Sequence, residues 1–236
     1  MKTILHKADT RGHANHGWLN SFHSFSFANY YDPERIHFGA LRVLNDDTVA
    51  GGMGFGAHPH DNMEIISIPI SGDLEHKDNM GNKQVISQGD VQVMTAGTGV
   101  QHSEKNKSDD KEVKFFQIWV IPKQRNLKPR YDQKNFADSD KHNTLLTVVS
   151  PVGTSDGGVQ INQDAWFSLG KLDKDFSTNY ELKNKKSGVY AFVIEGDVTI
   201  NGSKLNRRDG LGITGVSKLD IKADSNTELL LMEVPV

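Results

Sequence analysis

Residues 70–74 read Ile70-Ser71-Gly72-Asp73-Leu74, and residues 194–198 read Ile194-Glu195-Gly196-Asp197-Val198. A second turn follows each stretch, at Gly89-Asp90 in the first case and at Asp209-Gly210 in the second. A Gly-Asp pair between two apolar runs is typical of a tight turn between strands. One such turn is common in any β protein, but the same order of strands and turns twice in one chain indicates a duplicated unit. The sequence therefore predicts two β-barrels in series.

The remainder of the chain favours an all-β fold with few short helices. Short runs rich in Val, Ile and Phe are closed by Gly, Asn, Asp or Pro, and they predict strands near residues 40–44, 64–70, 91–94, 115–121, 145–149, 189–194 and 228–234. Sustained helical periodicity is scarce. The polar segment 123–143 is the predicted bridge between the barrels. We expect an N-terminal metal-binding barrel over 1–125, a linker over 126–144 and a C-terminal barrel without a metal site over 145–236.

The composition excludes several classes of protein and of site. With 27 basic and 30 acidic residues the net charge is −3, which predicts neither a nucleic-acid-binding nor a membrane-binding surface. The chain has no cysteine, so disulfides, thiolate metal sites and a cysteine nucleophile are ruled out. No run approaches the about 20 apolar residues of a membrane span, and no secretory signal is recognisable. We expect a soluble cytoplasmic protein, monomeric because the barrels cover each other's edges.

Ligand-type side chains occur in two places at the same spacing. In an extended chain, side chains two residues apart share a face, so His58, His60 and Glu64 are predicted to point the same way. His102 and Glu104 repeat this spacing. Two antiparallel strands facing into one barrel would bring these groups around a single point. A lone His-X-His pair is weak evidence for a metal site, but a second pair of ligand-type residues at the same spacing predicts one.

Imidazole and carboxylate ligands suit Fe, Mn, Co, Ni, Cu or Zn. A structural zinc site is closed and commonly uses thiolates, whereas four ligands that include three histidines leave positions open on a five- or six-coordinate ion. The pattern therefore indicates a catalytic metal site. The other histidines considered have no second partner at ligand spacing, and we expect surface or core roles for His13, His16, His23, His37, His76 and His142.

These residues resemble the two cupin motifs. The first motif is matched by Gly52, His58-Pro59-His60, Glu64 and Gly72, with one extra residue between Glu64 and Gly72. The second is matched by Gly89, Gly99, His102 and Asn106, with Thr95 where a proline is usual. Within the cupins the chain is similar to the pirin group over nearly its whole length. The stretches that carry this likeness are 13–18, 25–33, 94–99, 102–104 and 116–120.

The resemblance implies two cupin (jelly-roll) barrels in tandem, the first holding one divalent transition metal through three histidines and one glutamate. Carried over residue by residue, the ligands are His58, His60, His102 and Glu104. Fe(II) is expected, with Zn, Ni, Mn, Co and Cu as alternatives. Glu64 is a ligand in many other cupins and competes for the fourth place, although we expect it beside the ligands or against the pocket wall.

The second barrel lacks the corresponding residues. Aligning Gly196 with Gly72 places Leu182 and Asn184 at the two histidine positions of the first motif, and no histidine follows His142. We therefore expect a structural role for this barrel, packed against the first and covering strand edges.

The resemblance also implies a function, namely a metal-dependent dioxygenase of the quercetin 2,3-dioxygenase type. Such an enzyme cleaves a flavonol or similar small phenolic with O2. Glu104 is the expected catalytic proton acceptor. Phe55, Met53 and Glu64 are expected in the substrate pocket, although ordinary core packing accounts equally well for the two apolar residues. The alternative is a metal-bearing, redox-sensing regulatory protein that acts through a protein partner. A sugar-modifying or isomerase-type cupin does not account for the pirin-like stretches.

Overall fold

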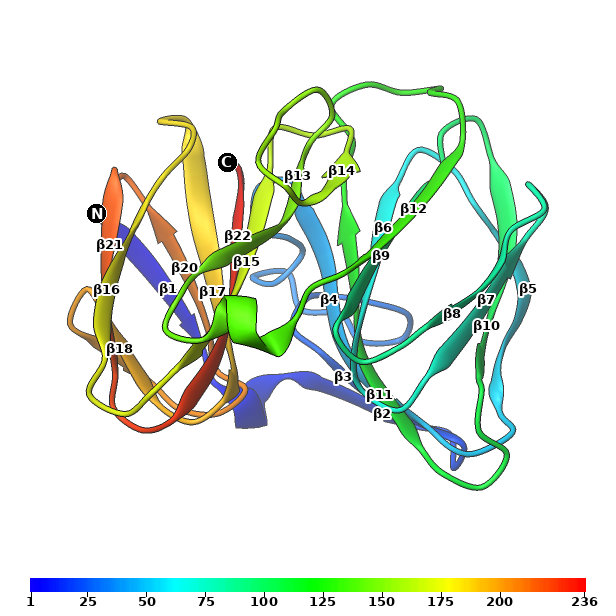
Figure 1. Cartoon of the computed structure of the whole chain (residues 1–236), viewed down its shortest axis with the longest axis horizontal. Coiled ribbons are helices and arrows are strands. Elements are labelled where there is room, and N and C mark those ends of the chain that lie inside the picture. Colours follow the sequence, from blue (N-terminus) through cyan, green and yellow to red (C-terminus); the bar gives the residue numbers. More distant parts are fainter.

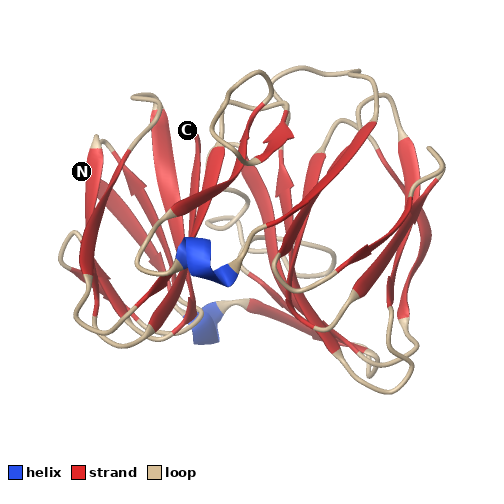
Figure 2. Cartoon of the chain, in the orientation of Figure 1, coloured by secondary structure: helices blue, strands red, loops and turns tan.

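The computed structural model describes residues 1–236, and nearly all of its regular structure is β-strand (Figure 2). The only helices are two short 3₁₀ segments, η1 (Ala8–Thr10) and η2 (Asp138–Lys141). Two seven-stranded and two four-stranded sheets form two barrels that lie side by side in Figure 1. The prediction of an all-β chain with two barrels in series is confirmed.

The first barrel pairs a large sheet with a small one. Its strands are β2 (Gly12–Asn15), β3 (Leu19–His23), β4 (Leu41–Val49), β5 (Gly54–His60), β6 (Glu64–Ser71), β7 (Leu74–Asp78), β8 (Lys83–Ile86), β9 (Asp90–Thr95), β10 (Val100–Asn106), β11 (Val113–Val120) and β12 (Arg130–Asn135). The large sheet has the order β12-β9-β6-β11-β4-β3-β2, and the small one has the order β5-β10-β7-β8. The two sheets enclose the interior in which the histidine motifs lie.

The second barrel repeats this plan. Its strands are β1 (Lys2–His6), β13 (Leu146–Pro151), β14 (Val159–Ile161), β15 (Trp166–Leu172), β16 (Ser177–Glu181), β17 (Ser187–Glu195), β18 (Val198–Ile200), β19 (Ser203–Leu205), β20 (Gly210–Thr214), β21 (Lys218–Ala223) and β22 (Thr227–Pro235). The sheets have the orders β1-β20-β17-β22-β15-β13-β14 and β16-β21-β18-β19. Gly72 and Gly196, at equivalent turns, adopt φ angles of +75° and +83° that favour glycine.

The strand pairing corrects the predicted domain boundaries at two places. Strand β1 belongs to the second barrel, because Lys2–His6 pairs antiparallel with β20; it is the blue strand among the orange and yellow ones in Figure 1. Residues 130–135, placed in the linker by the sequence, form β12 and pair with β9 of the first barrel. Both segments cover a sheet edge that would otherwise expose unpaired backbone groups. The predicted boundaries at 125 and 144 therefore do not separate the strands of the two barrels.

The largest apolar cluster lies between the barrels. It contains 23 buried residues and joins side chains from the large sheets of both barrels. Phe116 of β11 and Phe192 of β17 meet edge to face, with ring centroids 5.4 Å apart. Burial of this shared face stabilises the pair of barrels as one unit.

The two barrel interiors differ in polarity. The second interior is filled by 15 buried apolar residues, whereas the apolar clusters inside the first contain only 6 and 3. Buried polar side chains, including His76, His102 and Glu104, take their place in the first barrel. Such groups are buried only at a cost unless they are paired or hold a ligand. The polarity of the first interior therefore marks the position of the site.

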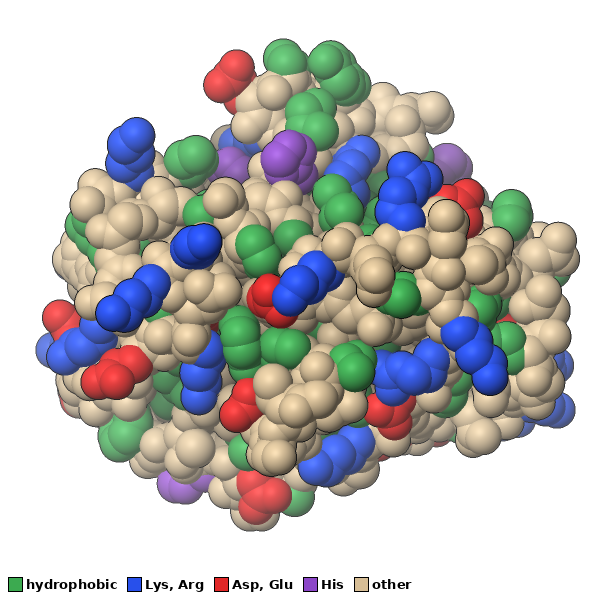
Figure 3. Space-filling view, turned by 90° about the horizontal axis from the view of Figure 1, so that it is seen from above, with side chains coloured by type: hydrophobic (Ala, Val, Ile, Leu, Met, Phe, Trp, Pro, Cys, Tyr) green, Lys and Arg blue, Asp and Glu red, His purple; other side chains and the backbone are tan.

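The outer surface carries charges of both signs. In the face shown in Figure 3, Lys and Arg side chains lie interspersed with Asp and Glu, without a large patch of one sign. Neither of the two helical segments has the length and apolar character needed to cross a membrane.

Candidate metal centre

Strand β10 is the element that organises the site. It pairs with β5 on one side, where His102 lies opposite His58, and with β7 on the other, where His102 lies opposite Asp78. Side chains along β10 alternate, so that His102 and Glu104 are buried while Gln101 and Lys105 are exposed. This alternation follows from the period-two geometry of a strand and turns both ligand-type residues into the barrel.

Three histidines converge at one point. One ring nitrogen from each of His58, His60 and His102 lies within 4.8 Å of the others, and the ring centroids are 4.5–4.9 Å apart. Nδ1 of His58 lies 2.7 Å from the carbonyl oxygen of Gly56. In the tautomer in which Nδ1 donates to this oxygen, Nε2 has a free lone pair that can bind a metal. Nε2 of His102 is buried without a hydrogen-bond partner. A buried nitrogen of this kind calls for an explanation, and a metal ion fits the donor set.

The electrostatics of the cluster favour neutral imidazoles. Burial, reinforced by the neighbouring His58, lowers the pKa of His60 to about 4. Burial and the adjacent histidines lower the pKa of His102 to about 2. The neutral ring is the form that binds a metal, so these side chains are in the ligating state at neutral pH without losing a proton first.

Glu104 is a buried carboxyl with two defined donors. The hydroxyl of Ser67 donates to Oε1 at 3.0 Å, and the amide nitrogen of Gln117 donates to Oε2 at 2.7 Å. Burial raises the pKa of Glu104 to about 7, although both hydrogen bonds act in the opposite direction. One of its oxygens groups with one ring nitrogen each of His102 and His76 within 4.8 Å, whereas the group that contains His58 and His60 does not include Glu104. The four predicted ligands therefore fall in two overlapping groups that share His102.

His76 is a site residue that the sequence reasoning missed. It is fully buried, its Nε2 lies 2.9 Å from Oδ2 of Asp78, and its Nδ1 lies 3.5 Å from Nδ1 of His102. Burial lowers its pKa, against the opposing effect of Asp78. The sequence does contain the signal, because His76 and Asp78 stand two residues apart on one strand. The same spacing rule that identified His58 and His60 applies to this pair.

Glu64 lies elsewhere, which corrects the prediction that it shares a face with His58 and His60. Asn62 adopts a φ of +46° and interrupts the extended chain, so β5 ends at His60 and β6 begins at Glu64 in the other sheet. The hydroxyl of Thr95 donates to Oε2 of Glu64 at 2.8 Å, and the amide of Asn162 donates to Oε1 at 3.1 Å. Glu64 therefore links the first barrel to the second.

A cavity of about 120 Å³ opens beside the histidines. His58, His60 and Glu104 line it, together with the aromatic residues Phe27, Phe55 and Trp119. The Trp119 ring meets the His60 ring edge to face, with centroids 4.9 Å apart. Of the three predicted pocket residues, Phe55 lines this cavity, whereas Met53 and Glu64 do not; Met53 is 42% exposed.

A polar wall of this cavity was also missed. Ser21 donates to Oδ1 of Asp47 in a short hydrogen bond, and Nε2 of His23 lies 2.8 Å from the Ser21 hydroxyl. Burial raises the pKa of Asp47 to about 7 and lowers that of His23 to about 4. Ser21 and His23 stand two residues apart on β3, but Asp47 is distant in the sequence, and only the pairing of β3 with β4 sets Ser21 opposite Asp47.

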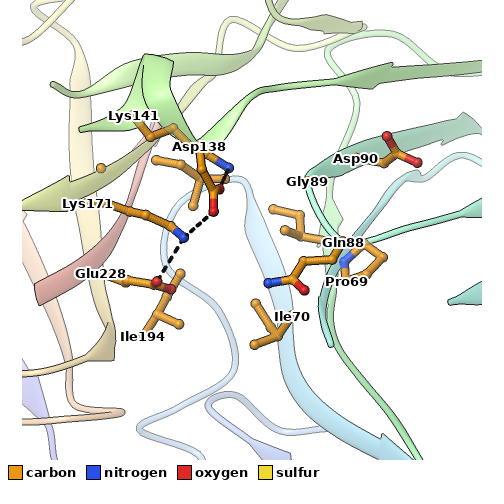
Figure 4. Close-up of a pocket in the computed structure, with 13 residues that line it drawn as sticks. Pro69, Ile70, Gln88, Gly89, Asp90, Asp138, Lys141, Lys171, Ile194 and Glu228 are labelled. Carbon is orange, nitrogen blue, oxygen red and sulfur yellow. Dashed lines mark hydrogen bonds and ion pairs between the residues drawn. The ribbon is translucent and has the colours of Figure 1, made fainter. Parts of the chain in front are cut away.

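A second cavity lies between the barrels (Figure 4). Lys171 lies 2.7 Å from Asp138 and 3.2 Å from Glu228, and Lys141 lies 2.8 Å from Asp138. These charges pair with one another, and the lining contains no histidine. The histidine cluster of the first barrel is therefore the candidate metal centre.

Comparison with known proteins places both barrels of this chain in known families. Residues 5–120 match the family model described as Pirin, and residues 147–234 match the one described as Quercetinase C-terminal cupin domain. A quercetin 2,3-dioxygenase of Escherichia coli K12 is 45% identical over 98% of both chains. A pirin-like protein of Caulobacter vibrioides is 40% identical over 95% of this chain and 96% of its own.

One similar solved structure contains a metal ion. It is that of a bacterial pirin from Escherichia coli in complex with nickel(II), and this chain superposes on it with a TM-score of 0.93 at 43% identity, with 99% of both chains covered. The full-length identity, the two cupin barrels and the histidine-rich metal site agree with one another. The chain belongs to the pirin family of two-domain cupin proteins.

Proposed function

We propose that this protein is a metal-dependent dioxygenase of the quercetin 2,3-dioxygenase type, which cleaves a flavonol or similar phenolic with O2. The observation that carries the proposal is the convergence of three histidines beside a cavity with aromatic walls. The relatives named quercetin 2,3-dioxygenase support it, because they match the chain over 98% of its length at 45% identity.

We assign the metal-holding role to His58, His60, His102 and Glu104. A divalent ion bound there supplies Lewis-acid activation of a hydroxyl oxygen and a centre for O2 chemistry. Fe(II) is the proposed native ion. The nickel(II) complex of the Escherichia coli pirin supports a divalent ion in a protein of this kind.

The chain's own residues then bind the ring and handle its proton. Phe55 and Trp119 form apolar walls against which a flat aromatic ring packs. Glu104 lines the cavity, so its carboxylate is placed to accept the proton of a hydroxyl group bound there. Ser67 and Gln117 hold the two carboxyl oxygens, so the proton is received at a fixed position.

The test is oxygen uptake together with flavonol loss. Protein freed of metal is reloaded anaerobically with Fe(II), Mn(II), Co(II), Ni(II), Cu(II) or Zn(II), beside a His58→Ala, His102→Ala double variant. We expect turnover that requires a metal and is lost in the double variant. His142→Ala is the matched control, because His142 is an exposed histidine that pairs with Asp173 far from the cluster.

The opposite outcome is equally informative. If the metals bind but none supports oxygen uptake, the dioxygenase assignment fails for this class of substrate. The regulatory role through a protein partner then becomes the better hypothesis, and its readout is binding to a partner that depends on the metal's oxidation state.

A further inference from the structure

His76 and Asp78, on β7, extend the histidine cluster beyond His102 and do not line the cavity. Both side chains are completely buried, and Nε2 of His76 lies 2.9 Å from Oδ2 of Asp78. Nδ1 of His76 faces Nδ1 of His102 at 3.5 Å, at the long limit of a hydrogen bond. The remaining nitrogen of His102, Nε2, is buried and has no partner. The three side chains thus form a row that ends at an unpaired nitrogen.

Only one arrangement of protons satisfies this row. A carboxylate only accepts, so Nε2 of His76 carries the hydrogen that it donates to Asp78. Nδ1 of the neutral His76 ring then has a free lone pair and accepts from Nδ1–H of His102. Nε2 of His102 is thereby left unprotonated. We propose that Asp78, acting through His76, holds His102 in the tautomer whose Nε2 binds the metal, an inference that rests on His102 being a ligand as proposed above.

The surroundings hold Asp78 in place for this role. The backbone N–H groups of Met80 and Asn82 donate to Oδ1 at 2.9 and 3.0 Å, and the Asn82 side-chain amide donates to Oδ2 at 2.8 Å. On the other side, the Tyr131 ring of β12 packs on His76 with centroids 4.9 Å apart. Hydrogen-bond partners behind a ligating histidine set its tautomer and orientation, usually as a carboxylate or carbonyl in direct contact. Here a second imidazole stands between the carboxylate and the ligand.

The first test needs no variant. Nitrogen–proton correlation NMR of metal-free protein with labelled histidines distinguishes Nδ1–H from Nε2–H rings. We expect His102 as the Nδ1–H tautomer and His76 as the Nε2–H tautomer. The opposite tautomer at either residue would overturn the proposal. In zinc-loaded protein a metal-shifted Nδ1 of His76 would also overturn it, because His76 would then be a ligand rather than a positioning residue.

The second test changes Asp78. In Asp78→Asn the amide presents a donor to His76, which favours the Nδ1–H tautomer there and the Nε2–H tautomer at His102. We expect metal binding about 10- to 100-fold weaker, measured for Zn(II) and Co(II) by competition with a chromophoric chelator. Asn82→Ala is the matched control, because it removes a turn contact of Asp78 without touching His76. This control is expected to bind both metals like the original protein.

Two outcomes would contradict the proposal that Asp78, acting through His76, sets the tautomer of His102. If Asn82→Ala weakens binding as much as Asp78→Asn, the turn rather than the tautomer is what matters. If Asp78→Asn binds metal normally while its NMR spectrum reports changed tautomers, the tautomer does not control the site. Neither measurement uses a flavonol or O2, so a failure here is separable from a failure of the dioxygenase assignment.

Discussion

At the scale of single residues, Asp47 is a buried carboxyl whose ionisation opposes folding. Burial raises its pKa from 3.8 to about 7 in the folded, metal-free protein, whereas the unfolded chain ionises near the ordinary value. Between about pH 4 and pH 7 the folded state therefore binds more protons, and this residue's contribution to stability falls as the pH rises. We expect Asp47→Asn to remove that loss. The free energy of unfolding of the variant should therefore gain on that of the original protein across this window, by up to a few kcal/mol, since each tenfold change in proton affinity corresponds to about 1.4 kcal/mol. Calorimetry of both proteins from pH 4 to pH 8 measures the difference, beside Asp9→Asn at an exposed position; a gap that does not vary with pH would refute the prediction.

Some residues of the site could be predicted from the sequence, and others could not. His58, His60 and His102 were found because residues two apart on a strand share a face. The group of Ser21, His23 and Asp47 was not found. Ser21 and His23 do share a face of β3, but Asp47 joins them only through the pairing of β3 with β4, and that register cannot be read from local spacing. Cavity walls assembled across strands depend on register, which one sequence does not state.

At the scale of elements, strand β1 closes the second barrel from the far end of the chain. It pairs with β20, Nδ1 of His6 lies 2.9 Å from the Tyr190 hydroxyl, and Lys7 forms an ion pair with Asp209 at 2.7 Å. We expect deletion of residues 1–7 to lower the melting temperature and to promote aggregation, because the deletion exposes the edge of β20. Ile4→Thr, at a side chain that is 57% exposed, keeps the backbone pairing and is the control. Light scattering and thermal unfolding test this, and a truncated chain as stable and monodisperse as the control would contradict it.

The Zn(II) affinity of the truncated chain is expected to stay unchanged, since the first barrel keeps all its strands.

Strands were easier to predict than their boundaries. The apolar runs near 64–70, 91–94 and 189–194 lie in β6, β9 and β17, because alternation and turn residues are local signals. The break at Asn62 was missed, since an asparagine with positive φ follows from the tertiary path rather than from a composition rule. Because the extended chain is interrupted at Asn62, Glu64 does not share a face with His58 and His60 and instead accepts a hydrogen bond from Asn162.

At the scale of the whole molecule, the two barrels behave as one packed body rather than as domains on a linker. The apolar cluster between them is larger than that inside either barrel, with 23 buried residues against 15 in the larger interior. The sequence predicted the duplication and the packing of the second barrel against the first, but not the size of this interface or the residues that form it. Strands buried on both faces contain the same apolar residues whether their second face meets the barrel interior or a neighbouring barrel.

The interface also contains a buried cluster of charges. Its contribution to stability can be compared with that of an exposed ion pair elsewhere between the barrels. Oδ2 of Asp46 lies 3.0 Å from Arg208 and 3.2 Å from Arg11, and both arginine side chains are only 7% exposed. Lys123 and Asp164 also pair at 2.8 Å, but their side chains are 65% and 40% exposed. Removing one partner of a buried pair leaves an unpaired charge, whereas an exposed pair is screened by water. We expect Asp46→Asn to lower the free energy of unfolding by about 3 kcal/mol and Asp164→Asn to lower it by less than about 1 kcal/mol. Urea unfolding followed by tryptophan fluorescence measures both. Equal losses would mean that the buried cluster does not hold the barrels together, and that the apolar face alone does so.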